Sequence, residues 1–299
     1  GAVLEIRNTL DVTVLDKGEP VQGVSVSVQG QSATTDVNGQ VSRTATALRV
    51  DSSGVMEQGI VPVTMQWGSI TDMLGWDTSS SLEHTFMAST IQGGTLTEWL
   101  ILEKAWSPYY LSSDLVVPFG QTMTVNDGVA LRVANGVTIS VEGDIVTGYS
   151  TISSTGGGAR WGGLFIGDNA ETSAVITGTN LVEGSPLLTV NGLADVVVSN
   201  ALISRSSGAE PLVRLTSDAS GEVQIVSTTL SDSASYCVEA QGNALLSLHD
   251  VTAQSCADSS LWARSTEVAI DGFVESTGVD LGAVQGTISN LNGSELMLY

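Results

Sequence analysis

The chain has 299 residues, enough for one large architecture or two modest domains, so burial of a core is not limiting. Its formal charge of −22, from 32 acidic and 10 basic residues, argues against nucleic-acid binding, which requires clustered Lys and Arg facing phosphates. No run of about 18 apolar residues is present, so we expect no membrane insertion. With 33 Gly, 6 Pro and abundant Val, Ser and Thr, the composition is typical of an all-β protein with many short strands.

The first strands are indicated by alternating apolar and polar residues. Leu10 to Leu15 and Val21 to Val28 both alternate, with a turn at Asp16 to Pro20 between them, and we predict a hairpin. A second turn at Asp36 to Gly39 precedes a strand that begins at Gln40.

These residues follow the pattern V-x-D-x-G-x-P-V-x-G-x-x-V and then T-T-D-x-x-G. The matching positions are Val14, Asp16, Gly18, Pro20, Val21, Gly23, Val26, Thr34, Thr35, Asp36 and Gly39. The stretch resembles the carboxypeptidase-regulatory-like and related immunoglobulin-like β-sandwich domains, which implies a structural or spacer module. Strands at Val61 to Trp67 and Leu82 to Ala88 would complete a sandwich that we place at residues 1–90.

A repeated pattern follows over residues 107–299, after a junction or cap at 91–106. Two apolar residues separated by one residue recur about every 22 to 27 positions. The pairs predicted for the first strand of each coil are Ala174/Ile176, Val196/Val198, Val223/Ile225, Leu246/Leu248 and Val268/Ile270. Those predicted for the second strand are Leu188/Val190, Val213/Leu215, Val238/Ala240, Leu261/Ala263 and Gly282/Val284. Two registers with one period predict a parallel β-helix with one coil per repeat.

A small or polar residue stands two positions after each first-strand pair, where we expect the chain to bend between faces. These residues are Gly178, Asn200, Ser227, Asp250 and Gly272. Val117 to Val125 and Arg160 to Ile166 are similar to coils of the right-handed parallel β-helix superfamily, which includes pectate-lyase-like enzymes, phage tailspikes and many surface proteins. The resemblance implies a right-handed β-helix after the sandwich and no particular chemistry.

Enzymes of this fold need clustered carboxylates and, in most cases, a basic residue on one face. The polygalacturonase-like set, N-T-D, D-D, G-H-G and R-I-K on successive coils, is absent from the sequence. Asp250 and Asp271 on neighbouring coils could form an acidic pair, although a solvated acidic ridge is the simpler interpretation. His84 and His249 are too isolated for a triad or a metal site. We predict no enzymatic activity, no cofactor and no metal site.

The two cysteines and one sequon bear on the compartment. Cys237 and Cys256 are expected to form a disulfide between neighbouring coils, with two buried free thiols as the alternative. Asn292 begins an Asn-Gly-Ser glycosylation triplet. Together these residues favour an extracellular or cell-surface location.

The expected function is structural: a rigid rod of coils carrying a small sandwich, as an adhesin, a layer component or a filament subunit. The alternative is a carbohydrate-binding or carbohydrate-cleaving protein, whose groove would need aromatic residues along one face of successive coils. Instead, Trp99, Trp106, Tyr109 and Tyr110 precede the repeats, where we expect them to cap the coils or seal the junction. Expected partners are copies of the chain, other surface proteins or glycans.

The two ends of the sequence suggest self-association. Leu4, Ile6 and Asn8 repeat the coil signature of apolar, apolar and polar residues before the sandwich begins. Leu296 and Leu298 resemble a half-finished coil, which would present unpaired backbone groups. If the first strand extended the last coil of another copy, the subunits would assemble head to tail. The alternative is that this strand joins its own sandwich.

Overall fold

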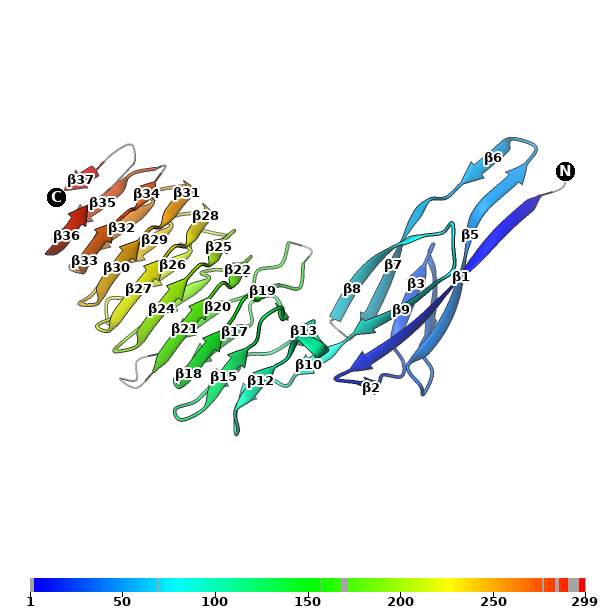
Figure 1. Cartoon of the computed structure of the whole chain (residues 1–299), viewed down its shortest axis with the longest axis horizontal. Coiled ribbons are helices and arrows are strands. Elements are labelled where there is room, and N and C mark those ends of the chain that lie inside the picture. Colours follow the sequence, from blue (N-terminus) through cyan, green and yellow to red (C-terminus); the bar gives the residue numbers. More distant parts are fainter. Residues whose placement is uncertain are drawn as a thin grey trace. The chain divides into compact units, whose positions relative to one another are not determined.

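The structure is a computed structural model that describes residues 3–68, 70–156, 158–167, 172–275, 277–282, 285–289 and 296–298 (Figure 1). Two compact units divide the chain at residues 90 and 91. Both are built from strands, and the helical structure in the described residues is a 3-10 turn at Lys104–Trp106. No helix in these ranges has the length and apolar character needed to cross a bilayer. The predicted all-β class is confirmed.

The N-terminal unit consists of two sheets. The strands of the first sheet are β1 (Leu4–Asp16), β2 (Glu19–Pro20), β5 (Gln40–Asp51), β6 (Gly54–Glu57) and β9 (Leu82–Met87). Those of the second sheet are β3 (Ser25–Val28), β4 (Gln31–Thr34), β7 (Ile60–Trp67) and β8 (Ile70–Asp77). Their order is β2-β1-β5-β6 in the first sheet, with β9 parallel to β1, and β4-β3-β7-β8 in the antiparallel second sheet.

Alternation along the strands decides which side chains the two sheets bury. Leu10, Val12 and Val14 of β1 and Val26 and Val28 of β3 are at most 2% exposed. The residues between them are half-buried or exposed, because successive side chains of a strand point to opposite faces.

The predicted hairpin is wrong in its second strand. Only Glu19 and Pro20 turn back along β1, opposite Asp16 and Leu15. The chain then leaves this sheet, and Ser25–Val28 pairs with β4 and β7 of the other one. Hydrophobic alternation is the same for a strand that turns back and for one that crosses to a facing sheet, so the pattern alone could not distinguish them.

The turn predicted at Asp36 to Gly39 is confirmed, and it joins β4 of one sheet to β5 of the other. The Asp36 carboxylate accepts hydrogen bonds from the backbone N–H groups of Asn38, at 2.8 Å, and Gln40, at 2.9 Å. Both hydrogen bonds lower the pKa of Asp36, and the bond from Gln40 contributes more than the bond from Asn38. Gly39 has φ +70°, and a Cβ there would lie 2.5 Å from the carbonyl oxygen of Val14, so this position requires glycine.

The C-terminal unit is a parallel β-solenoid of three sheets (Figure 1). In the described residues these sheets have nine, ten and nine strands. Sheet I contains β10 (Ser89–Ile91), β13 (Tyr109–Leu111), β16 (Ala130–Val133), β19 (Thr151–Ser154), β22 (Asn180–Val182), β25 (Leu202–Ser204), β28 (Thr229–Ser233), β31 (Thr252–Cys256) and β34 (Val274–Glu275). Sheet II contains β11 (Gly94–Thr95), β14 (Leu115–Val117), β17 (Thr138–Val141), β20 (Gly163–Ile166), β23 (Leu188–Val190), β26 (Val213–Leu215), β29 (Val238–Ala240), β32 (Leu261–Arg264), β35 (Val279–Gly282) and β37 (Leu296–Leu298).

Sheet III contains β12 (Leu100–Leu102), β15 (Thr122–Val125), β18 (Asp144–Thr147), β21 (Ser173–Thr177), β24 (Asp195–Ser199), β27 (Glu222–Val226), β30 (Leu245–His249), β33 (Glu267–Asp271) and β36 (Gln285–Ser289). Neighbours within a sheet are mostly three strands apart in chain order, so one coil contributes one strand to each sheet. Within residues 91–106, β11 and β12 pair in parallel with β14 and β15.

The registers predicted from the repeats are confirmed with one exception. In sheet III the first-strand row runs through Ala174, Val196, Val223, Leu246 and Val268, and in sheet II the second-strand row runs through Leu188, Val213, Val238 and Leu261. Leu261 then pairs with Val279, so the predicted last pair, Gly282/Val284, is wrong. The error arises because this last coil is shorter than the preceding ones, and Val284 lies outside the described residues.

The bends that follow the first-strand pairs are confirmed and have a conformational cause. All five residues have a positive φ: Gly178 +62°, Asn200 +51°, Ser227 +47°, Asp250 +50° and Gly272 +73°. This left-handed region is open to Gly, and Asn and Asp adopt it more readily than other side chains, whereas a β-branched residue would be strained there. The backbone N–H groups of the first four bends continue the ladder, as in the bond from Asn200 to the Val226 oxygen at 3.1 Å.

Inward-facing side chains form one continuous core through the coils. Ile145, Ala174, Val196 and Val223 stack in successive strands of sheet III and are all 0% exposed. Each coil therefore buries its apolar residues against the coils on either side.

Candidate functional site

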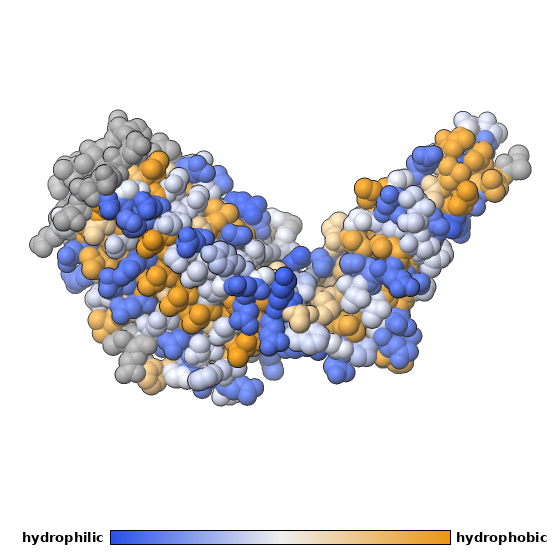
Figure 2. Space-filling view, in the orientation of Figure 1, coloured by the Kyte–Doolittle hydropathy of each residue, from blue (hydrophilic) through white to orange (hydrophobic). Residues whose placement is uncertain are grey.

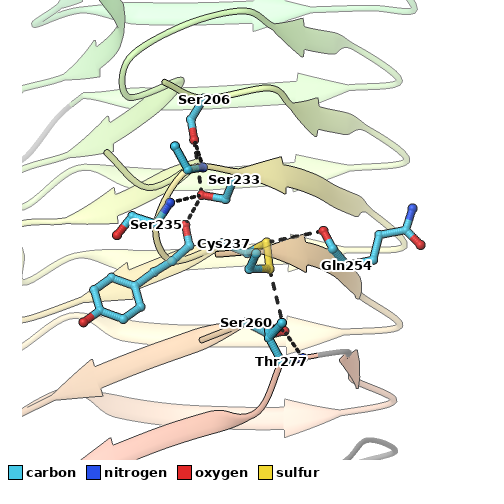
Figure 3. The surroundings of a disulfide bond; sticks show 10 residues. Ser206, Ser233, Ser235, Cys237, Gln254, Ser260 and Thr277 are labelled. Atoms are coloured by element: carbon cyan, nitrogen blue, oxygen red, sulfur yellow. Dashed lines mark hydrogen bonds between the residues drawn. A yellow bond between two sulfur atoms is a disulfide. The ribbon is translucent and has the colours of Figure 1, made fainter. Parts of the chain in front are cut away.

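The predicted disulfide is present. Cys237 and Cys256 are bonded, with 5.5 Å between their Cα atoms, and both side chains are buried (Figure 3). Cys256 ends β31 and pairs in register with Ser233 of β28, so the bond links neighbouring coils. Buried hydroxyl groups lie beside it, and the Ser206 and Ser233 Oγ atoms are 3.2 Å apart. This cluster stabilises the stack and holds no free thiol.

The acidic pair predicted at Asp250 and Asp271 has an imidazole between its members. His249 Nε2 lies 3.3 Å from Asp250 Oδ2, and His249 Nδ1 lies 3.4 Å from Asp271 Oδ2. Sequence reasoning considered His249 alone and missed this arrangement, although the repeat register places His249 opposite Asp271. The three side chains are 48–63% exposed, so water and salt screen their attraction.

Neither histidine belongs to a metal-binding cluster in the described residues. Within the part of the chain that the structure describes, no group of three or more His, Cys, Asp or Glu side chains is arranged to hold a metal ion. His84 lies in the other unit, on β9, with its ring 4.5 Å from that of Phe86 in an edge-to-face contact. Burial lowers the pKa of His84, and the charge of Asp72 partly opposes this effect.

A cluster of aromatic and charged side chains covers the outer face of sheet II near its C-terminal end. The rings of Tyr236 and Trp262 stack with centroids 5.7 Å apart, and the Arg264 guanidinium lies 4.8 Å from the Trp262 centroid. Arg264 Nη2 is also 2.8 Å from Asp280 Oδ1. Burial raises the pKa of Tyr236, and Asp258 adds to this rise. The spacing of Trp262 and Arg264 on one strand was the signal that sequence reasoning missed.

An ion pair extends this cluster along the sheet. Arg214 and Glu239 occupy the same outward row on neighbouring coils, and their side chains are 2.9 Å apart. Glu239 is next in register to Trp262. We call Tyr236, Trp262, Arg264, Asp280, Arg214 and Glu239 the sheet II cluster.

The aromatic residues before the repeats have different environments. Tyr109 and Tyr110 of β13 are each 2% exposed, and the Tyr109 hydroxyl bonds to both the backbone N–H and the carbonyl of Glu103. Trp106 packs against the solenoid core, whereas Trp99 is 69% exposed.

The predicted N-terminal association residues lie in β1 of their own sheet. Leu4, Ile6 and Asn8 pair with β5, which is the alternative that the sequence left open. The other edge of β1 pairs with β9 only from Leu10 onward. Residues 4–8 therefore have one edge along which no strand of the described chain lies.

Apolar side chains gather at this end of the sheet (Figure 2). Leu4 and Ile6 are 61% and 48% exposed, and Val55 and Met56 of β6 are 68% and 55% exposed. We call residues 4–8 of β1 the free edge. An unpaired edge beside exposed apolar surface is a template for pairing with another strand.

The predicted C-terminal association residues lie in β37. Leu296 and Leu298 pair in parallel with Val279 and Leu281 of β35. Asn292, the glycosylation candidate, lies outside the described residues. The contact between the two chain ends of different copies stays a prediction.

Comparisons with known proteins give one partial similarity. No protein family and no solved structure matches the chain. A stretch of 59 residues, 19% of the chain, is 42% identical to Protein bark beetle of Drosophila melanogaster. The match spans 2% of that protein's length, so it extends to a small segment of it.

Proposed function

We propose that this chain is a non-catalytic structural protein of the extracellular space or cell surface. The observation that supports this proposal best is the stack itself, in which three sheets continue in register around one core. A stack of this kind gains length and stiffness with each coil, which suits a spacer or display rod. Its core positions are occupied by apolar residues that serve packing rather than chemistry.

Two finer features belong to the same proposal. The solenoid is right-handed, because crossovers between parallel strands have this hand in nearly all proteins. The N-terminal unit is an immunoglobulin-like sandwich, on the strength of its two sheets and of the Val14 to Gly39 pattern.

The proposed location rests on the disulfide and the charge. A disulfide between buried cysteines favours an oxidising compartment. A charge of −22 favours solubility and opposes binding to nucleic acid, which is also negatively charged.

Self-association belongs to this structural role, and a head-to-tail filament or layer is the form of it that the sequence predicts. The free edge of β1 would extend the last coil of the next copy, and partners would then be copies of the chain itself. Other surface proteins or glycans are the remaining expected partners.

The test combines imaging with an activity assay on the purified chain. Negative-stain images should show rods or assemblies, and incubation with acidic and neutral polysaccharides should release no product. Product release that is abolished by Asp250→Asn or Asp271→Asn, and retained in Glu83→Gln, would overturn the proposal.

Carbohydrate binding is the second candidate, and the sheet II cluster favours it. Tyr236 and Trp262 come from successive coils on one face, as a sugar platform would require, although each ring already contacts a neighbour. Calorimetry against a glycan panel should then show binding that Trp262→Ala removes. Trp99→Ala is the control, since Trp99 is exposed and lies outside this cluster.

A further inference from the structure

The backbone of the free edge has a defined donor and acceptor pattern. The N–H of Thr9 donates to the Oγ of Ser81, and the carbonyl of Leu15 accepts a bond from Ala88, both on the side where β9 lies. Odd-numbered residues of β1 therefore direct their backbone groups toward this side. Even-numbered residues face β5, as the bond from Val14 N–H to the Gly39 oxygen shows. Along the free edge, the outward groups are thus those of Glu5 and Arg7.

We propose that the free edge pairs antiparallel with the same edge of a second copy of this chain, with Ile6 on the two-fold axis. In this register Glu5 lies opposite Arg7 of the other copy and exchanges both backbone hydrogen bonds with it. The symmetry repeats the pair, so four hydrogen bonds form across five residues. The contact is isologous and closes at two copies.

Charge selects this register over its neighbours. An axis through Glu5 would place two glutamates opposite each other, and an axis through Arg7 would place two arginines opposite each other. Like charges directly opposite on paired strands are destabilising, whereas opposite charges stabilise the pair. Of these three axes, only the one through Ile6 places a glutamate opposite an arginine in both hydrogen-bonded pairs.

The sheet already holds part of this charge row. Glu5 pairs in register with Arg49 of β5, with 3.7 Å between their charged groups, and lies 2.7 Å from Arg7 of its own strand. In the dimer each Glu5 would stand between Arg49 and Arg7 of the other copy. Arg7 and Arg49 are paired with Glu5 and Asp51, so the charged side chains of these four residues on β1 and β5 balance one another. This row therefore adds no net charge of its own to the contact between two copies.

The apolar face agrees with the same register. Leu4 and Ile6 alternate with the charged residues and share the face of β1 that buries Leu10 and Val12 further along. On the axis, the two Ile6 side chains would lie directly opposite each other in a non-hydrogen-bonded pair, where side chains are closest. Pairing would therefore cover part of the exposed Ile6 surface.

The inference builds on the self-association in the proposed function and names a different partner for the free edge. One edge accepts one strand, so a dimer through β1 and a head-to-tail contact through β1 exclude each other. The proposed structural role does not depend on whether the dimer or the head-to-tail contact forms.

The experiment is sedimentation equilibrium of the full chain and of two charge-reversed variants, up to about 1 mM chain. Glu5→Arg and Arg7→Glu each place like charges opposite each other in both pairs of residues 5 and 7. Each variant should raise the dissociation constant of the dimer about tenfold or more. Mixing the two variants restores opposite charges in every row, so the mixture should form a one-to-one heterodimer. Glu83→Arg, with the same charge change on β9 of the same sheet, should dimerise like the unchanged chain.

Circular dichroism first confirms that each variant is folded. A chain that stays monomeric over the whole range, a dimer that neither reversal weakens, or a mixture that forms no heterodimer would each overturn the inference. Filaments that survive both reversals would favour the head-to-tail contact instead. Polysaccharide cleavage would overturn the proposed function and leave the dimer untouched, so the two failures can be told apart.

Discussion

Both units of this chain bury apolar side chains between sheets, but they differ in how far apart in the sequence the paired strands lie. In the solenoid each strand pairs with its equivalent in the next coil, as Val196 does with Val223. In the N-terminal unit Leu10 pairs with Leu82, at the far end of the unit. Pairing between sequence neighbours repeats one pattern many times, whereas pairing between distant strands leaves no repeat. The difference explains why the register of one unit is visible in the sequence and that of the other is not.

The two units also differ in how they make turns. In the N-terminal unit Gly39 closes a single turn where the backbone of Val14 leaves no room for a side chain. In the solenoid the left-handed bends recur in five successive coils and accept Asn, Ser and Asp as well as Gly. A defect in the first kind of turn should disrupt one joint between sheets, whereas a defect in the second should weaken one coil among many.

Loss of the disulfide should have the largest effect on the stability of one unit relative to the other. Cys237 and Cys256 are 19 residues apart, and removing a bond across such a loop costs about 3 kcal/mol. The Cys237→Ala, Cys256→Ala double variant should unfold its solenoid at lower urea concentration and leave the N-terminal transition unchanged. Reduction of the unchanged chain is the control. A shift of both transitions would mean that the units do not unfold independently.

A glycine substitution should act in the opposite unit. Gly39→Ala combines a left-handed backbone with a Cβ 2.5 Å from the Val14 oxygen, and should cost the N-terminal unit about 2–3 kcal/mol. Gly30→Ala is the matched control, because Gly30 has φ +75° but nothing within 4 Å of its Cβ position. It should cost only about 1 kcal/mol. Equal losses in thermal unfolding would show that backbone strain, and not the close approach, governs this turn.

A smaller effect is expected at a solenoid bend. Asn200 is exposed and has φ +51°, so a substitution there changes the backbone preference and little else. Asn200→Val should destabilise the solenoid by about 1–2 kcal/mol, because a β-branched side chain is strained in the left-handed region. Asn200→Gly should be close to neutral. A valine variant as stable as the unchanged chain in urea unfolding would contradict this conformational explanation.

The sequence predicted the solenoid well because each core row contains apolar residues at a spacing of about 22 to 27 positions, as in Ala174, Val196 and Val223. It failed at Gly282 and Val284, where the coil shortens and the period no longer holds. It also failed at Val21 to Val28, because alternation records which face of a strand is buried and not which strand lies beside it.

The candidate sites were predicted less completely than the fold. The disulfide was predicted because Cys237 and Cys256 are the two cysteines of the sequence and the repeat places them on neighbouring coils. The predicted register already places His249 opposite Asp271, and this consequence was missed. The stacking of Tyr236 on Trp262 depends on side-chain directions at the coil surface that the period does not encode. The free edge of β1 depends on where β9 begins, which is set by distant pairing.

The smallest effect concerns acid stability of the N-terminal unit. The N–H groups of Gln40 and Asn38 bond the ionised Asp36 carboxylate, so its pKa in the folded chain lies below the ordinary value of 3.8. The unfolded chain then binds a proton more readily than the folded one as the pH falls through this range. The stabilisation is fully present above pH 3.8 and is lost as the pH falls through the lower, folded-state pKa.

Asp36→Asn removes the charge but keeps a side-chain oxygen that can cap the turn. The variant should therefore be less stable than the unchanged chain at neutral pH, and the difference should shrink in acid. Urea unfolding of the N-terminal transition at several pH values between neutral and strongly acidic measures this, with Glu83→Gln on β9 as the charge-matched control. Because Asp36 is exposed, water screens its bonds, and the effect should be smaller than that of Gly39→Ala three residues away. A difference that stays constant with pH would show that the turn depends on its glycine and not on its carboxylate.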